Sequence, residues 1–337
     1  MNIPNKMNYI EVKKHKGKNT LLLNQSDIPS INDDEILIKV FASGVNRPDI
    51  LQRKGLYAPP KDASPIIGLE VSGKIVKLGK KVKKLKVNDK ICALTHGGGY
   101  AEYCKVHYKH ALSIPKGMNY VEAAAIPENF FTVWYNLIDR AKIKKNETIL
   151  IHGGSSGIGS IAIQLAKFHE CRVITTVGNK NKCLFCKSLG ADLVINYNKD
   201  DFFKKIQLYT NNSGVDIILD MVGKNYFNKN LTLLKDKGRL IMIAFLSGSI
   251  VKADLTQVMI KRLILSGSTL RPRTVKEKTR IASNIYKSYW TALAKKTIKP
   301  IIFKIYDLKD ACKAHNLMES SKHIGKIILR TNSKEKK

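Results

Sequence analysis

A glycine-rich turn between a short apolar run and a long periodic segment constrains this chain more than any other feature. The stretch reads Thr148-Ile-Leu-Ile-His-Gly-Gly-Ser-Ser-Gly-Ile-Gly-Ser-Ile-Ala-Ile-Gln-Leu-Ala-Lys167. The run before the turn has the length of a buried parallel strand, and the segment after it has helical periodicity without a breaker. The sequence therefore predicts a strand, a tight turn and a helix.

Each glycine of this turn has a physical role if a dinucleotide binds there. Gly154 is expected to allow the sharp turn, Gly157 to admit a pyrophosphate close to the backbone, and Gly159 to let the helix pack on the strand. The free N–H groups and the dipole of the helix would hold the phosphates. Ser156 replaces the middle glycine of the commonest G-x-G-x-x-G spacing. The turn alone is therefore a weak signal, and an ordinary strand–helix connection is its alternative.

The segment that follows favours NADP over NAD. A second strand-like run, residues 172–177, completes a βαβ unit, at whose end an NAD site carries Asp or Glu for the ribose 2′-hydroxyl. This chain instead reads Val177-Gly-Asn-Lys-Asn-Lys182 there, without an acid. Lysine attracts a 2′-phosphate that an acid would repel. The alternative is that Lys180 and Lys182 only begin a solvated helix.

Composition indicates a globular protein with more than one domain. The chain has 337 residues, of which 44% are hydrophobic, enough for two cores. It contains neither an apolar stretch of membrane-spanning length nor an N-terminal apolar signal core, so a cytoplasmic protein is expected. The formal charge of +32 keeps nucleic acid open as a partner. The lysines are spread along the whole chain, however, which does not favour a dedicated basic face.

Two patterns of strands indicate two architectures. In the first third, short strand-like runs separated by polar turns suggest a compact barrel-like domain; they are residues 20–24, 35–42, 71–78, 90–94 and 101–106. After the glycine turn, runs at residues 193–196, 217–220 and 239–243 each follow a helical stretch. That alternation predicts a doubly wound parallel sheet.

Several segments together resemble one known family from end to end. They are Asn46-Arg-Pro-Asp49, Gln52-Arg-Lys-Gly-Leu-Tyr-Ala-Pro-Pro60, Gly68-Leu-Glu-Val-Ser-Gly73, Gly97-Gly-Gly-Tyr-Ala-Glu-Tyr103, Glu122-Ala-Ala-Ala-Ile-Pro-Glu128 and Ile324-Gly-Lys-Ile-Ile-Leu329. The chain is similar to the zinc-independent quinone oxidoreductases of the medium-chain dehydrogenase/reductase superfamily, in the tumour-suppressor-inducible branch. The resemblance implies an α/β protein, with a GroES-like β-rich catalytic domain and a Rossmann nucleotide-binding domain.

The resemblance also implies that no metal takes part. Zinc alcohol dehydrogenases carry Cys where this chain has Ser43 or Asn46, and Gly-His-Glu where it has Gly68-Leu-Glu70. Leucine cannot bind a metal, and the four-cysteine structural lobe of the zinc enzymes is missing. Without a Lewis acid the site suits an acceptor that takes hydride readily, such as a quinone or an activated alkene.

The family pattern places two catalytic candidates beside the nicotinamide, Asn46 and Tyr57. An amide and a phenol can hydrogen-bond quinone oxygens and orient the acceptor, and Tyr57 could also donate a proton. Their alternatives are a turn-capping amide and a packed loop aromatic. The cofactor contacts implied by the family are Thr132, Gly154, Ser155, Ser156, Gly157, Ile158, Gly159, Gly178, Asn179, Lys182, Tyr197, Phe245, Leu270 and His323. We interpret His152 as structural.

These arguments lead to a zinc-free, NADPH-dependent quinone oxidoreductase that forms a homodimer, with a tetramer left open. We expect a GroES-like domain over residues 1–127, a Rossmann domain over residues 128–270 and a C-terminal segment, residues 271–337, that completes the first domain. Two alternatives stay open. One is an NADPH-dependent reductase of α,β-unsaturated carbonyls, and the other is nucleic-acid binding. The sequence does not distinguish one-electron from two-electron reduction.

Overall fold

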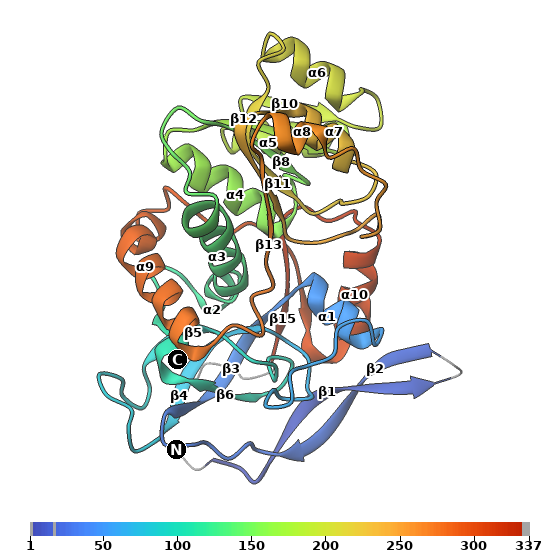
Figure 1. Cartoon of the computed structure of the whole chain (residues 1–337). Helices are drawn as coiled ribbons and strands as arrows, with labels where there is room; N and C mark the ends of the chain where they lie inside the picture. The colour runs from blue at the N-terminus through green and yellow to red at the C-terminus, as the bar shows by residue number, and fades with distance from the viewer. Residues whose placement is uncertain (1–2, 16–17, 332–337) are drawn as a thin grey trace. The chain divides into compact units, whose positions relative to one another are not determined.

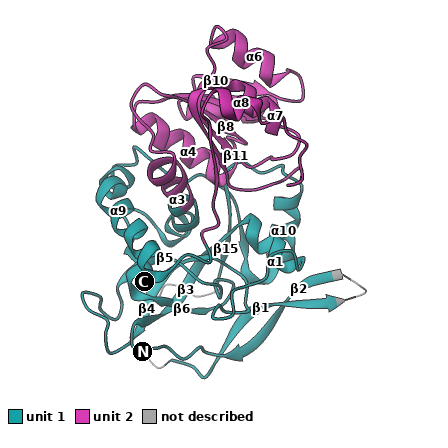
Figure 2. Ribbon diagram, viewed as in Figure 1, with its two compact units in different colours: residues 1–131, 271–337 teal, residues 132–270 magenta. Residues whose placement is uncertain are grey.

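The chain divides into two compact units in the computed structural model, which describes residues 3–15 and 18–331. Unit 1 comprises residues 1–131 and 271–337, and unit 2 comprises residues 132–270 (Figure 1 and Figure 2). The sequence prediction placed the first division at residue 127 and the second at residue 270. The observed first division falls inside the helix α3 (Pro127–Val133), so that helix belongs to both units.

Unit 2 is built on a six-stranded parallel sheet with the order β10-β9-β8-β11-β12-β13. The strands are β8 (Thr148–His152), β9 (Arg172–Val177), β10 (Leu193–Asn196), β11 (Val215–Asp220), β12 (Leu234–Met242) and β13 (Ile264–Gly267). The strand order reverses between β8 and β11. In open α/β sheets a ligand binds outside the carboxyl ends of the strands at such a reversal.

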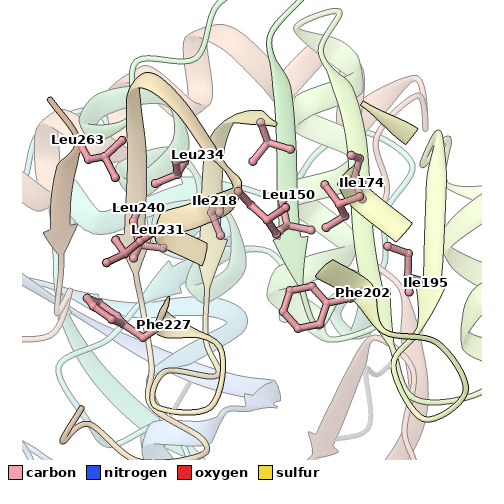
Figure 3. Close-up of a cluster of buried hydrophobic side chains, with 13 residues drawn as sticks. Leu150, Ile174, Ile195, Phe202, Ile218, Phe227, Leu231, Leu234, Leu240 and Leu263 are labelled. Carbon is pink, nitrogen blue, oxygen red and sulfur yellow. The ribbon is translucent and has the colours of Figure 1, made fainter. Parts of the chain in front are cut away.

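The strands of unit 2 alternate with helices, as a parallel sheet requires. These helices are α4 (Gly157–Phe168), α5 (Lys180–Ser188), α6 (Phe202–Tyr209), α7 (Phe227–Leu233) and α8 (Thr256–Ile260). Leu150, Ile174 and Ile218 come from three neighbouring strands and pack with Phe202 and Phe227 from the helices α6 and α7 (Figure 3). This buried cluster fixes the sheet and thereby the loops at its carboxyl edge.

Unit 1 is built on a mostly antiparallel seven-stranded sheet and a two-stranded hairpin. The sheet has the order β14-β15-β3-β4-β5-β7, and β6 pairs with β3. The strands are β3 (Glu35–Val45), β4 (Glu70–Leu78), β5 (Lys90–Leu94), β6 (Tyr103–His107), β7 (Ala111–Ser113), β14 (Ile302–Asp307) and β15 (Lys326–Arg330). The hairpin consists of β1 (Lys6–His15) and β2 (Lys18–Asp27). Because β15 lies between β14 and β3, the C-terminal segment contributes two strands to the first domain's sheet.

Four further helices cover unit 1: α1 (Arg47–Arg53), α2 (Tyr120–Ala123), α9 (Val275–Ala294) and α10 (Ala311–Glu319). The helix α9 begins at a capping box in which Thr274 and Glu277 bond each other's backbone N–H groups. The helix α1 begins at Asn46, whose N–H donates to the Asp49 carboxylate at 2.8 Å. That bond fixes the entry to α1 and, with it, the position of the Asn46 side chain.

Most expected strands lie where the sequence placed them. The runs at residues 90–94, 172–177 and 193–196 match β5, β9 and β10. The run expected at residues 101–106 begins later, at Tyr103, because Ala101 pairs instead with Tyr9 in an isolated bridge. The helix α3 is followed directly by a π-helical segment, Trp134–Arg140. Among the described residues, no helix is long and apolar enough to cross a membrane.

Candidate active site

The glycine turn of unit 2 depends on the absence of side chains at two positions. A Cβ added at Gly154 would lie 2.1 Å from Thr175 Oγ1, and one added at Gly159 would lie 2.3 Å from the carbonyl oxygen of Gly153. Gly159 therefore allows the start of α4 to pack against the turn, whereas we had expected it to let the helix pack on the strand. The left-handed residue is Gly153, with φ of 73°. The sharp turn that we assigned to Gly154 thus belongs to Gly153, while Gly154 permits the close approach of the neighbouring strand β9.

The start of α4 leaves hydrogen-bond donors for a ligand. Ser156 caps the helix, because its hydroxyl accepts the N–H of Gly159 at 2.9 Å. The N–H of Ser160 reaches the Ser156 carbonyl. Among the described residues, the N–H groups of Gly157 and Ile158 have no protein acceptor. Donors at the N-terminus of a helix of this length suit a phosphate.

The other candidates of unit 2 lie after the carboxyl ends of parallel strands. Ser155 follows β8, Gly178, Asn179 and Lys182 follow β9, Tyr197 follows β10, Phe245 follows β12 and Leu270 follows β13. Tyr197 lies against Gly178, since a Cβ there would be 2.7 Å from the Tyr197 hydroxyl. Successive parallel strands thus bring residues far apart in sequence to one edge of the sheet.

The segment after β9 combines a helix cap with a lysine. The Asn179 side chain accepts the N–H of Lys182 at 2.9 Å and caps α5. Lys182 is half-buried, and burial lowers the pKa of its ammonium. Lys180 is exposed. The segment therefore contains a partly desolvated cation and, from Gly178 to Lys182, no carboxylate.

A buried polar network in unit 1 holds the first catalytic candidate, Asn46. Its amide donates to Glu70 Oε1 at 2.9 Å, and its Oδ1 accepts from Lys326 Nζ at 2.6 Å. Lys326 also forms an ion pair with Glu70 Oε1. All three side chains are buried. A Cβ on Gly44 would overlap the Glu70 carboxylate, so glycine is required on the neighbouring strand β3.

A second buried carboxyl, Asp49, lies next to this network. It accepts the N–H groups of Asn46 and Gly68 and the hydroxyl of Tyr100. Burial raises the pKa of Asp49 to about 7, although its hydrogen bonds and Lys326 oppose the shift. These bonds tie the start of α1 to the segment that precedes Glu70.

The second catalytic candidate, Tyr57, lies in the loop after α1 and is half-buried. The Arg271 guanidinium is 5.8 Å from the centroid of its ring, and Arg271 Nη1 donates to Gln52 at 2.7 Å. Burial and the nearby Glu128 carboxyl raise the pKa of Tyr57. Among the described residues, the Tyr57 hydroxyl has no hydrogen-bond partner, so it is free to bind an acceptor.

Three remaining residues have different settings. Thr132 is half-buried near the end of α3, and its carbonyl accepts from Asn136. His323 is half-buried in the segment before β15. His152 is fully buried in β8, and both of its ring nitrogens are within hydrogen-bond distance of protein oxygens, on Thr176 and Asn230. Burial lowers the pKa of His152, which fits the structural role we gave it.

Sequence reasoning missed three charged residues at this network, namely Glu70 and Lys326 within it and Asp49 next to it. One signal was available. Lys326 precedes the apolar run Ile327–Leu329 in a strand, and a lysine is almost never buried without a partner. The identity of the partner, Glu70, could not be read from the sequence, because it lies far away along the chain.

The turn of unit 2 fits a pyridine dinucleotide. Side chains are excluded at Gly154 and Gly159, two helix N–H groups lack acceptors, and a lysine follows the second strand. Phosphates require such donors and such room. A dinucleotide would therefore be held by the turn through its pyrophosphate and by the segment after β9 through its adenosine end.

Comparisons with known proteins agree with this assignment. Residues 32–116 match a family model described as alcohol dehydrogenase GroES-like domain, and residues 157–284 match one described as zinc-binding dehydrogenase. Quinone oxidoreductase of Homo sapiens is 30% identical over 327 residues, covering 96% of this chain and 97% of that protein. Quinone oxidoreductase 1 of Escherichia coli strain K12 is 30% identical over 329 residues, covering 95% and 98%.

A solved structure extends the likeness to three dimensions. The crystal structure of Escherichia coli quinone oxidoreductase complexed with NADPH has a TM-score of 0.82 at 27% identity, covering 96% of this chain and 99% of that one. The fold and the glycine turn define a pyridine-nucleotide-dependent oxidoreductase with a Rossmann unit and a GroES-like unit. The chain belongs to the medium-chain dehydrogenase/reductase superfamily, and within it to the quinone oxidoreductase family.

The buried ion pair generates a prediction about stability. Replacing Lys326 by Met leaves the Glu70 carboxylate buried without its cation, which costs roughly 3–5 kcal/mol of unfolding free energy. Adding Glu70→Gln to that variant removes the uncompensated charge and is expected to restore part of the loss. The midpoint of urea unfolding measures both effects.

A surface pair provides the matched control. Lys145 and Glu170 pair at 2.7 Å on an exposed face of unit 2, and Lys145→Met is expected to change stability by less than about 1 kcal/mol. Equal midpoints for the Lys326 and Lys145 variants would contradict a stabilising role of the buried pair.

Proposed function

We propose that this protein reduces quinones with NADPH, without a metal ion. The observation that carries the proposal is the Lys326 ammonium, which contacts both Asn46 and Glu70. In the zinc enzymes, the segment that corresponds to Asn46 carries a cysteine ligand, and the segment that corresponds to Glu70 carries a histidine ligand. The Lys326 ammonium therefore already neutralises the negative charge of Glu70 at this position. Leu69, which stands where the zinc enzymes have the histidine, has no atom that can bind a metal. Such a site favours an acceptor that takes hydride without Lewis-acid activation.

Tyr57 and Asn46 have different roles in this proposal. The amide of Asn46 is engaged by Glu70 and Lys326, so its orientation is fixed, and one lone pair on its oxygen remains for a polar contact. Among residues 3–15 and 18–331 the Tyr57 hydroxyl has no hydrogen-bond partner, so it can donate to a quinone oxygen. NADPH supplies the hydride. The protein contributes the position of the acceptor, which is the main requirement for a quinone.

The relatives support a quinone as acceptor, and we favour this enzymatic role over nucleic-acid binding because the family is one of oxidoreductases. The alternative acceptor is an α,β-unsaturated carbonyl compound, which needs the same hydride and the same placement. A homodimer in the cytoplasm completes the proposal. The positive charge of the chain then serves solubility and gives only salt-sensitive attraction to nucleic acid.

The acceptor is tested by NADPH oxidation, followed by absorbance, with an ortho-naphthoquinone beside an alkenal. Quinone turnover is expected to exceed alkenal turnover. Tyr57→Phe is expected to lower kcat/KM for the quinone about fivefold, since one hydrogen bond to the acceptor is worth about 1 kcal/mol. Tyr209→Phe, on an exposed surface of unit 2, is the matched control. Alkenal turnover without quinone turnover would transfer the proposal to the alternative acceptor.

The cofactor preference is tested at the N-cap of α5. Asn179→Asp preserves the cap, because both residues cap well, but places a carboxylate beside the expected 2′-phosphate. Repulsion is expected to raise the Kd for NADPH about tenfold and to leave that for NADH unchanged or lower. Asn179→Ser is the uncharged control with a capping hydroxyl. Fluorescence titration with both nucleotides measures the four constants, and a parallel weakening of both cofactors would contradict an NADPH preference.

The homodimer is proposed to form through the edge strand β13. This strand pairs only with β12 among the described residues, and Ile264 on it is 55% exposed. The neighbouring segment exposes further apolar side chains, namely Phe245, Leu246, Ile250, Met259 and Ile260. An unpaired edge with exposed apolar residues favours strand pairing with a second copy.

Sedimentation velocity tests this interface. Ile260→Lys with Ile264→Lys is expected to convert dimers into monomers, because two desolvated charges would face their counterparts across a symmetric contact. Leu208→Lys, at a residue that is 76% exposed on α6, is the control and should remain dimeric. A dimer that persists in the double variant would place the interface elsewhere.

A further inference from the structure

Arg271 is a buried cation, and most of its guanidinium group has no partner. The residue is only 5% exposed. Its Nη1 donates to Gln52 Oε1 at 2.7 Å, whereas its Nε and Nη2 are buried without a hydrogen-bond partner among the described residues. No carboxylate in the described part of the chain lies within ion-pair distance of it. Arginine is almost never fully buried unless it is paired, so this exception requires an explanation.

The two unpaired nitrogens lie on the same edge of the guanidinium group. The N–H bonds of Nε and Nη2 are parallel, and this edge suits a ligand group with two coplanar oxygens. Gln52 holds the guanidinium through the third nitrogen, and its own amide donates to the carbonyl of Pro65 at 3.1 Å. A Cβ on Gly97, whose φ is 104°, would lie 3.2 Å from Nη2. Glycine at this position therefore keeps a side chain away from the unpaired edge.

A second buried cation, Lys278, fixes the backbone of Arg271. The Lys278 ammonium donates to the carbonyl oxygen of Arg271 at 2.7 Å and lies 3.4 Å from Nδ1 of His96. Because an ammonium only donates, His96 accepts at Nδ1 and carries its proton on Nε2, which lies 3.2 Å from the Asp62 carboxylate. The carboxylate in this series of contacts is thus the exposed Asp62, and it contacts neither Arg271 nor Lys278 directly.

The surroundings leave positive charge at Arg271 uncompensated. Burial lowers the pKa of its guanidinium, and the weaker influences of Tyr57, Asp49 and Glu128 oppose this shift. A guanidinium nonetheless stays protonated at neutral pH. A buried charge without a counter-charge is costly, and an anionic ligand group would remove that cost.

Tyr57 connects this cation with the expected acceptor. The centroid of its ring is 5.8 Å from the guanidinium carbon of Arg271. Its hydroxyl has no hydrogen-bond partner in the part of the chain that the structure describes, and its side chain is half-buried. The phenol and the guanidinium are therefore neighbours in unit 1, close enough for one bicyclic ligand to contact both.

We propose that Arg271 binds a carboxylate group of the acceptor, so that this protein favours acceptors that carry a carboxylate. This inference rests on the proposed function, which places the acceptor at Tyr57. The carboxylate accepts two parallel hydrogen bonds from Nε and Nη2 and supplies the missing counter-charge. Because both nitrogens are covered in this structure, the half-buried Tyr57 side chain moves to admit the carboxylate and then hydrogen-bonds the acceptor.

The first test measures binding without turnover. The anion 2-naphthoate and the neutral 2-naphthamide are titrated by calorimetry into the protein in the presence of NADP⁺, and 2-naphthoate is expected to bind more tightly. Arg271→Met is expected to raise the Kd for 2-naphthoate about 10²-fold, since a buried charged partner is lost. Arg271→Lys is expected to raise it about tenfold, because lysine keeps the charge but lacks the two parallel donors. The Kd for 2-naphthamide should change much less.

Arg330→Met is the matched control. Arg330 is an exposed arginine of unit 1 that pairs with Asp307 at 3.1 Å, and its replacement should leave both constants unchanged. If Arg271 serves only to hold Gln52 and Tyr57, Arg271→Met should weaken both ligands equally and lower the midpoint of urea unfolding. That result, or equal affinity of the wild type for the two ligands, would overturn the proposal.

The second test separates this inference from the proposed function. Turnover with NADPH is compared for 1,4-naphthoquinone-6-carboxylate and its methyl ester, and for 3-benzoylacrylate and its methyl ester. The wild type is expected to prefer each acid, and Arg271→Met to lose the preference. Turnover of quinones without a preference for the acid would overturn the role of Arg271 and leave the proposed function standing. Turnover of the enones alone, with the acid preferred, would refute the quinone and support Arg271.

Discussion

The buried ion pair between Glu70 and Lys326 organises unit 1 of this protein. Glu70 on β4 binds Lys326 on β15, the Asn46 amide before α1 and the N–H of Glu128 at the start of α3. Four segments that are distant in sequence therefore meet at one carboxylate. Desolvating these charges is costly, and the cost is offset only because each polar atom finds a partner.

Unit 2 depends on a constraint of another kind, which is the exclusion of side chains at its glycine turn. The turn after β8 approaches β9 and the start of α4 so closely that a Cβ at Gly154 or Gly159 would overlap protein atoms. At the start of the same helix, the N–H groups of Gly157 and Ile158 have no acceptor among the described residues. In unit 2 the lack of side chains at two glycines shapes the turn, whereas in unit 1 buried charged groups hold the segments together.

Periodicity and local propensity predicted much of the fold. The strands β5, β9 and β10 and the alternation of strands with helices in unit 2 follow from apolar runs of fixed length between turn residues. Local sequence patterns predicted less of the structure where pairing between distant segments determines which strands join a sheet. The strands β14 and β15 join the sheet of unit 1 only because β15 pairs with β3, from which it is separated by most of the chain. Ala101 is a second example, because it was expected to begin the strand at residues 101–106 but pairs with Tyr9 in an isolated bridge.

The sequence by itself determined the nucleotide turn, the absence of an acid after β9 and the family, because these depend on short contiguous stretches. It also pointed to Asn46 and Tyr57 through the family pattern. Only the tertiary structure decided that Lys326 pairs with Glu70 and that the Asn46 amide is engaged in this network. The physical reason is that the folded chain brings distant segments together, and this determines which partner a buried charge has and how much solvent it loses.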